Sequence, residues 1–283
     1  MTRAQRTLKK EVSFSGVGLH TGKAVTMRFC PAPPHSGIVF QRVDLPGKPT
    51  IPAACEYVQD TSRSTCIGIG SCSVQTVEHV LAAVHAFQID NLCIQVNEGE
   101  PPIGDGSSLP FVEMIESVGI EEQRSTTSVV RLKEPVYFSH GATHLVMVPS
   151  DVYRISYTLH YPNTPVIRSQ YFSFEVNEEN FKREVSSCRT FALYEEITAL
   201  MERGLIRGGS LENAVVIKDD VVFSKEGLRF QDEMVRHKVL DLIGDLSLVG
   251  FHFLAHVIAI RSGHMSNVAL GKALIKQVSS YKV

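Results

Sequence analysis

The sequence Val235-Arg-His-Lys-Val-Leu-Asp-Leu-Ile-Gly-Asp-Leu246 predicts a largely buried helix that carries polar residues on one stripe. His237, Asp241 and Asp245 stand four residues apart, so all three side chains project from the same face. The stretch Val77-Glu-His-Val-Leu81 begins a second helical pattern in the first half of the chain. Each stretch opens an apolar helix with a histidine at its polar start, which favours an internal duplication.

Strands precede helices in each half of the sequence. In the first half we expect a strand over 25–29, a helix over 77–87, a strand over 92–96 and a helix that begins at Ser107 or Ser108. In the second half we expect strands over 129–132, 144–148, 153–159, 171–176 and 255–260, and helices over 192–202 and 231–249. This order is typical of an α+β fold with two layers in each domain.

The segment Glu121-Glu-Gln-Arg-Ser-Thr-Thr-Ser128 contains no apolar residue and is interpreted as a linker. It divides the chain into an N-terminal α+β domain, residues 1–122, and a C-terminal α+β domain, residues 129–283. We therefore predict two similar two-layer α/β-sandwich domains.

Composition excludes several classes of protein. The 283 residues are 43% hydrophobic and 20% charged, which is typical of a globular chain. The net charge of −2, without a block of like charge, argues against a nucleic-acid binder. No apolar run approaches the roughly 20 residues of a membrane-spanning helix. The six cysteines have no disulfide or zinc-finger spacing, which favours a reducing compartment, the cytoplasm. The sequence has no coiled-coil pattern that would indicate an oligomer, so we expect a monomer.

The helical stripe is a candidate metal site. His237 and Asp241, one turn apart, can place a nitrogen and an oxygen on one metal ion. Burying several ionisable groups is costly unless they are paired or bind a metal. An ion-paired face formed with Lys238 and Arg236 explains the same spacing, and taken alone the helix leaves both interpretations open.

A second pair, Glu78-His79, favours the metal interpretation. Catalytic zinc sites have three protein ligands, an open position and a nearby general base. His79, His237 and Asp241 supply the ligands, and Glu78 stands next to one of them as the base. We therefore expect Zn²⁺ at this site, and Fe²⁺ stays open as an alternative because His and Asp ligands suit several divalent ions.

Two further histidines lie on glycine-containing segments. His264 follows a predicted strand and is either a site residue or an exposed turn residue. His20 lies on a glycine-rich loop that lacks the Gly-Lys-Ser/Thr ending of a phosphate-binding loop, and its role stays open.

Taken together, nine motifs in order along the chain resemble the UDP-3-O-acyl-N-acetylglucosamine deacetylases, the zinc enzymes of lipid A synthesis. The motifs are Gly16-Val-Gly-Leu-His-Thr-Gly22, Thr76-Val-Glu-His79, Ile89-Asp-Asn91, Asp105-Gly-Ser107, Arg189-Thr-Phe191, Gly208-Gly-Ser210, Gly227-Leu-Arg-Phe230, the helix Val235–Leu246 and Ser262-Gly-His264. Each motif alone is weak, but their joint occurrence is highly specific.

The resemblance implies a role for each matching residue. His79, His237 and Asp241 match the zinc ligands, and Glu78 matches the general base. Thr190 matches a hydroxyl that helps to hold the oxyanion. His264 matches a protonated histidine that gives a proton to the leaving amine, and Asp245 matches its carboxylate partner. Lys238 matches a residue that meets the polar head of the substrate.

The resemblance also implies a βαβ insertion around residues 187–217 that forms an apolar passage for the acyl group. Suitable lining residues are Phe191, Leu193, Ile197, Leu200, Ala214 and Val216, although each is also a normal core position of an amphipathic helix or strand. Tyr161 is a candidate for stacking on the uracil. Asp105 matches a family motif but also suits a helix cap.

These observations support a metal-dependent hydrolase that removes acetate from the 2-acetamido group of UDP-3-O-acyl-N-acetylglucosamine. A second hypothesis keeps the metal chemistry but acts on another N-acyl amino sugar or small amide. A third is a non-catalytic protein that binds a nucleotide sugar or an acyl chain. A structural zinc protein fits least well, because structural sites usually have four ligands rich in cysteine.

Overall fold

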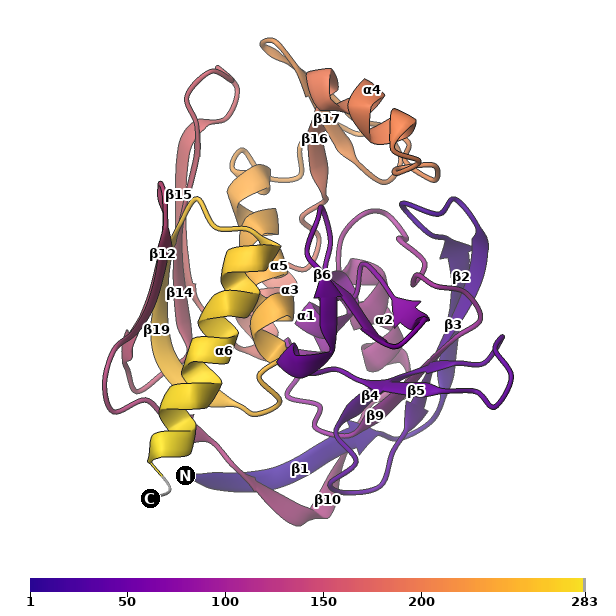
Figure 1. Ribbon diagram of the computed structural model, residues 1–283, viewed down its shortest axis with the longest axis vertical. Helices are drawn as coiled ribbons and strands as arrows, with labels where there is room; N and C mark the ends of the chain where they lie inside the picture. Colours follow the sequence, from indigo (N-terminus) through magenta and orange to yellow (C-terminus); the bar gives the residue numbers. More distant parts are fainter. Residues whose placement is uncertain (282–283) are drawn as a thin grey trace.

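The computed structural model describes residues 1–281 and places two sheets on the outside of the molecule with helices between them (Figure 1). The first sheet has the strand order β2-β3-β9-β4-β5. Its strands are β2 (Val12–Val17), β3 (Ala24–Pro31), β4 (Ile38–Arg42), β5 (Thr50–Pro52) and β9 (Leu92–Val96).

The second sheet has the strand order β12-β13-β19-β14-β15, with the short strand β11 also paired to β19. Its strands are β11 (Val130–Arg131), β12 (Val136–His140), β13 (Thr143–Pro149), β14 (Arg154–Tyr161), β15 (Arg168–Glu175) and β19 (Phe253–Ile260). Alternate residues of β19 are buried, as its period-two pattern requires.

The two sheets repeat one topology. In the first, β9 pairs antiparallel with β3 and parallel with β4; in the second, β19 pairs antiparallel with β13 and parallel with β14. A helix precedes and follows each of these central strands. These helices are α1 (Glu78–Ala86) and α2 (Leu109–Val118) in the first half, and α5 (Glu233–Ser247) and α6 (His264–Ser280) in the second. The α+β fold is thus confirmed, and the repeated order is what an internal duplication predicts.

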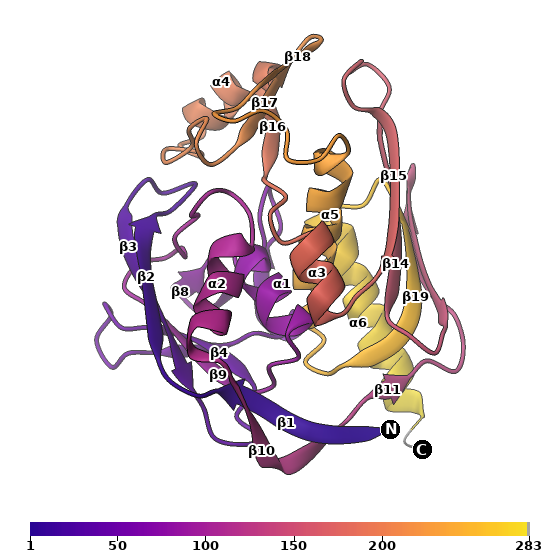
Figure 2. The same ribbon diagram turned by 180° about the vertical axis from the view of Figure 1, so that it is seen from behind.

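Helices α1 and α5 pack against each other at the centre of the molecule, and both views show them between the sheets (Figures 1 and 2). Every residue of α1 is buried. Gly244 of α5 permits the close approach, because a Cβ atom there would overlap the backbone of Glu78. This contact brings the start of α1 to the polar stripe of α5.

The predicted linker is wrong. Residues Ile120–Ser128 form strand β10, which pairs antiparallel with β1 (Thr2–Leu8) in a two-stranded ribbon. Apart from Ile120, which packs against the core, β10 is polar, and amide hydrogen bonds supply part of its inner contacts. Asn91 donates to Gln5 at 2.9 Å and to Gln123 at 2.7 Å. The domain boundaries at 122 and 129 stay a prediction.

The βαβ unit is present, with different bounds. Strand β16 (Phe191–Leu193) pairs parallel with β17 (Val215–Lys218), and α4 (Tyr194–Glu202) connects them. The predicted helix over 192–202 therefore begins at Tyr194. Strand β18 (Val221–Phe223) pairs antiparallel with β17, which extends the unit to Phe223. We call residues 191–223 the insertion.

Helix α6 has no counterpart among the predicted elements. The remaining elements are short. They are the small sheet of β6 (Val58–Asp60), β7 (Cys66–Ile69) and β8 (Cys72–Val74), the 3-10 turn Cys55–Tyr57 and helix α3 (Glu178–Glu184). Within residues 1–281, no helix combines the length and apolar character needed to cross a bilayer.

Candidate active site

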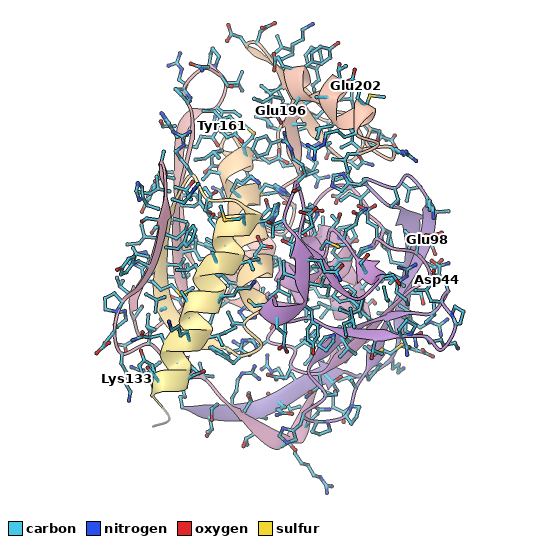
Figure 3. All side chains as sticks on the ribbon, in the orientation of Figure 1. Asp44, Glu98, Lys133, Tyr161, Glu196 and Glu202 are labelled. Carbon is cyan, nitrogen blue, oxygen red and sulfur yellow. The ribbon has the colours of Figure 1, made fainter. Side chains whose placement is uncertain are left out.

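One cavity of about 640 Å³, between the central helices and the insertion, is lined by all but one of the predicted site residues. They are Glu78, His79, Tyr161, Thr190, Phe191, Leu193, Ile197, Ala214, Val216, His237, Lys238, Asp241 and His264. The exception, Asp245, is fully buried behind His264. Figure 3 labels two residues of the cavity, Tyr161 and Glu196, at the end of the molecule where α4 lies.

The structure brings His79, His237 and Asp241 together at the contact of α1 with α5. One ligand atom from each lies within 4.8 Å of the other two. Oδ1 of Asp241 is 3.4 Å from Nε2 of His237 and 3.7 Å from Nε2 of His79. All three side chains are buried.

The hydrogen bonding of this cluster fits a divalent metal ion. Nδ1 of His237 donates to the carbonyl oxygen of Cys188 at 3.1 Å, so the lone pair of Nε2 faces Asp241. Burial lowers the pKa of His237 to about 4, which keeps the ring neutral at pH 7. Among the described residues, Oδ1 of Asp241 has no hydrogen-bond partner although it is buried. Facing lone pairs of this kind suit a shared cation, and two histidines with one carboxylate match a catalytic zinc site.

The ion-paired alternative describes the other oxygen of Asp241. Nζ of Lys238 donates to Oδ2 at 2.7 Å. Burial disfavours the charge on Lys238, but Asp241 outweighs it and raises the pKa of the lysine. Arg236 pairs instead with Glu184 and Asp232. The two interpretations are therefore compatible, one for each carboxylate oxygen.

Glu78 lines the cavity beside this cluster. Its Oε2 accepts a hydrogen bond from the backbone N–H of Thr65 at 3.0 Å. Burial raises the pKa of Glu78 to about 7, although His264 and His79 oppose the rise. A carboxylate with a pKa near neutrality is suited to general-base catalysis.

His264 is the first residue of α6, so the interpretation as an exposed turn residue is wrong. Its Nδ1 lies 2.9 Å from Oδ2 of Asp245, and Asn267 donates to the same oxygen at 2.8 Å. Burial disfavours a charged His264, but the Asp245 carboxylate outweighs it and raises the pKa of His264 to about 9. The ring is therefore protonated at neutral pH.

Thr190 is held in the cavity wall by its backbone. Its N–H donates to the carbonyl oxygen of Gly106 at 2.8 Å. The neighbouring Asp105 lies outside the cavity, where it accepts a hydrogen bond from Arg229 at 2.6 Å. Gly106 has a φ of +89°, a left-handed conformation that favours glycine. The Asp105-Gly-Ser107 motif thus supports the segment that carries Thr190.

The insertion forms the apolar part of the cavity through Phe191, Leu193, Ile197, Leu200, Ala214 and Val216. It docks on the first half of the chain. Arg63 pairs with Glu196 of α4 at 2.7 Å, and Gly208 donates to the carbonyl oxygen of Leu19 at 3.0 Å. The cavity is thereby bounded by two regions that are distant in sequence.

Tyr161 and His20 also line the cavity. Tyr161, at the end of β14, contacts Phe191 edge-on at 6.1 Å between ring centroids and also borders a second cavity of about 370 Å³ beside Lys238. His20 is held through its backbone N–H by the buried carboxylate of Glu100 at 3.1 Å. Its ring lines the cavity near the insertion.

Comparison with known proteins identifies the family. The model of the UDP-3-O-acyl N-acetylglycosamine deacetylase (LpxC) family matches residues 5–276. The chain belongs to this family. It is 53% identical over 277 residues to the UDP-3-O-acyl-N-acetylglucosamine deacetylase of Chlamydia pneumoniae, covering 98% of each chain. It is also 53% identical over 276 residues to that of Chlamydia caviae, again covering 98% of each. The identity with that of Chlamydia trachomatis serovar L2 is 51% over 274 residues, covering 97% of this chain and 96% of the relative. The resemblance inferred from the motifs is confirmed.

Two residues of this LpxC-family site were not identified from the sequence. Thr65 contacts both Glu78 and Asp245, and Asn267 contacts Asp245. Asn267 stands three residues after His264, so a predicted helix over 264–280 would have placed both side chains on one face. No local pattern connects Thr65 to residues so distant in sequence.

Proposed function

We propose that this protein removes acetate from the 2-acetamido group of UDP-3-O-acyl-N-acetylglucosamine, a step of lipid A biosynthesis, with Zn²⁺ held by His79, His237 and Asp241. The observation that carries the proposal is the buried cluster of these three residues, with Glu78 and His264 beside it in one cavity. Relatives named for this reaction share about half of the sequence.

Zn²⁺ at this site supplies a Lewis acid that polarises a carbonyl and makes water more acidic. Glu78 takes a proton from the attacking water. His264, kept charged by Asp245, gives a proton to the nitrogen of the leaving amine. The hydroxyl of Thr190 donates to the carbonyl oxygen as that oxygen gains negative charge.

The shape of the cavity supports the assignment of the substrate. The acyl group occupies the apolar part formed by Phe191, Leu193, Ile197, Ala214 and Val216. Lys238 contacts the diphosphate, for which a lysine is a suitable point charge. Tyr161, beside the second cavity, stacks on the uracil. An amide lacking an acyl chain would leave the apolar part empty.

The test combines metal content with acetate release from UDP-3-O-acyl-N-acetylglucosamine. We expect one Zn²⁺ per chain and acetate release in the wild-type protein, and the loss of both in His79→Ala. Glu78→Gln is the matched variant on the same turn of α1. It should keep the metal and lose on the order of 10²–10⁴-fold in kcat, because it removes only the base.

Each other outcome selects an alternative. Bound metal without acetate release keeps the hydrolase and discards this substrate in favour of another N-acyl compound. Absence of both metal and release favours a protein that binds a nucleotide sugar or acyl chain. Loss of metal in Glu78→Gln would make Glu78 a ligand. Iron in place of zinc would change only the identity of the metal.

We also propose that the protein is a cytoplasmic monomer. The scattered cysteines, which lack disulfide spacing, support a reducing compartment. Light scattering of the purified protein at micromolar concentration tests the monomer, since a mass of twice 31.3 kDa would contradict it.

A further inference from the structure

Thr65 contacts two carboxylates of the site from behind the cavity. It lies between β6 and β7 and is fully buried. Its backbone N–H donates to Oε2 of Glu78 at 3.0 Å, and its hydroxyl donates to Oδ1 of Asp245 at 2.5 Å. A single residue therefore connects the start of α1 with α5.

The contact with Asp245 completes the hydrogen bonding of that carboxylate. Oδ2 receives Nδ1 of His264 and the amide of Asn267, whereas Oδ1 receives the Thr65 hydroxyl. With donors on both oxygens, the carboxylate cannot rotate without leaving a buried polar group unpaired, which is costly. Hydrogen bonds to both oxygens therefore fix the plane of the Asp245 carboxylate, and this carboxylate in turn orients the His264 ring.

The contact with Glu78 selects one of its oxygens. Thr65 occupies Oε2, which leaves Oε1 to accept a proton from water in the cavity. The segment that supplies this N–H also contacts the insertion, because Arg63, two residues earlier, pairs with Glu196 at the surface.

We propose that Thr65 is a positioning residue that orients Glu78 through its backbone and the Asp245–His264 pair through its hydroxyl. The proposal rests on the proposed deacetylase function, because it assigns proton transfer to Glu78 and His264. Thr65 itself does not line the cavity, so it acts on the reaction only through these neighbours.

Two comparisons test the Thr65 hydroxyl by itself. Wild type is compared with Thr65→Val, in which a methyl group replaces the hydroxyl. Thr65→Ser, which keeps a hydroxyl, is compared with Thr65→Ala, which lacks one. Hydrogen-bond partners that orient active-site groups are typically worth 10–100-fold in activity. We expect kcat to be lower by that factor in the member of each pair without a hydroxyl, with KM within about twofold because no cavity contact changes. The second pair keeps the test valid if valine is not accommodated.

The matched control is Thr7→Val, which removes another buried threonine hydroxyl far from the site. That hydroxyl donates to the carbonyl oxygen of Asn91 at 2.7 Å. We expect Thr7→Val to lower stability and leave kcat unchanged. If Thr7→Val lost as much kcat as Thr65→Val, the effect of Thr65→Val would be explained by general destabilisation of the protein.

A spectroscopic measurement separates this proposal from the proposed function. We expect the Nδ1 proton of His264, which is shared with Asp245, to give a downfield resonance in ¹⁵N-histidine-labelled protein, and this measurement needs no turnover. It should shift or broaden in Thr65→Val and Thr65→Ala and persist in Thr65→Ser. If wild type releases no acetate, the proposed function fails, and this resonance still decides the role of Thr65. An unmoved resonance, or equal kcat in Thr65→Ser and Thr65→Ala, overturns the proposal.

Discussion

At the level of single residues, Glu78 and His264 set the pH dependence of the proposed reaction. Burial raises the pKa of Glu78 to about 7, and Asp245 outweighs burial to raise that of His264 to about 9. Glu78 must be deprotonated to accept a proton, and His264 must be protonated to donate one. We expect kcat/KM to rise with pH through about 7 and to fall above about 9. A flat profile between pH 5.5 and 10 would contradict these roles.

Asp245→Asn tests the assignment of the alkaline limb. The variant loses the charge that keeps His264 protonated, so burial then lowers the pKa of the ring. The alkaline limb should move to lower pH, and kcat should fall by 10–100-fold. The same pH–rate measurement on both proteins checks this. An alkaline limb that does not move belongs to a group other than His264.

The residues accessible to sequence analysis are those that share a local spacing. His237 and Asp241 lie one helical turn apart, and Glu78 and His79 are adjacent, so a pattern exists before any fold is known. Thr65 has no such relation to Asp245, because only the packing of α1 against α5 brings them together. Sequence spacing therefore indicated the candidate metal ligands, but it gave no information on the hydrogen bonds that orient the side chains around them.

Among the elements, the contact of α1 with α5 carries the site and depends on Gly244. A Cβ atom at this position would overlap the carbonyl oxygen of Glu78. We expect Gly244→Ala to lower the free energy of unfolding by about 1–3 kcal/mol, the usual cost of overpacking, and to weaken metal binding by separating the helices. Urea denaturation and metal titration measure the two effects.

The control for this prediction is Gly271→Ala in α6. Its Cβ would meet only side-chain atoms, at 3.2 Å from Cys55 Sγ and 3.3 Å from Val249 Cγ1, and these can adjust. Alanine also favours a helix over glycine by about 1 kcal/mol. Gly271→Ala should therefore be close to neutral. Equal destabilisation by both variants would remove the special role of Gly244.

Sequence patterns predicted the helices and strands whose buried face is apolar. They did not predict those whose buried face is polar. Helices α1 and α5 show a clear helical period and were predicted within two residues at each start. Helix α6 buries Ser266, Asn267 and Gly271 along with its apolar residues, so its period is incomplete. Strand β10 is entirely polar except for Ile120, and only its pairing with β1 makes it a strand.

Over the whole molecule, the two halves meet at two stacked histidines outside the cavity, the buried His85 and the half-buried His252. The rings of His85 and His252 stack with centroids 4.6 Å apart. Burial lowers the pKa of His252 to about 3 and that of His85 well below its ordinary value, and Arg3 acts in the same direction. Both rings are therefore neutral in the folded protein at pH 5, where the unfolded chain binds a proton at each.

This junction makes the folded state sensitive to acid. Because the unfolded chain takes up protons below about pH 6.5 and the folded chain does not, the stability contributed by each ring is complete above that pH and is lost as the pH falls. For His252 alone the loss between pH 7 and pH 5 is about 2 kcal/mol. His252→Gln cannot take up this proton, so its free energy of unfolding should fall by about 2 kcal/mol less than that of wild type over the same interval. Urea denaturation of both proteins at pH 7 and pH 5, with metal removed by a chelator, measures the difference. The exposed His140→Gln should behave like wild type, and equal losses in all three proteins would show that the acid sensitivity arises elsewhere.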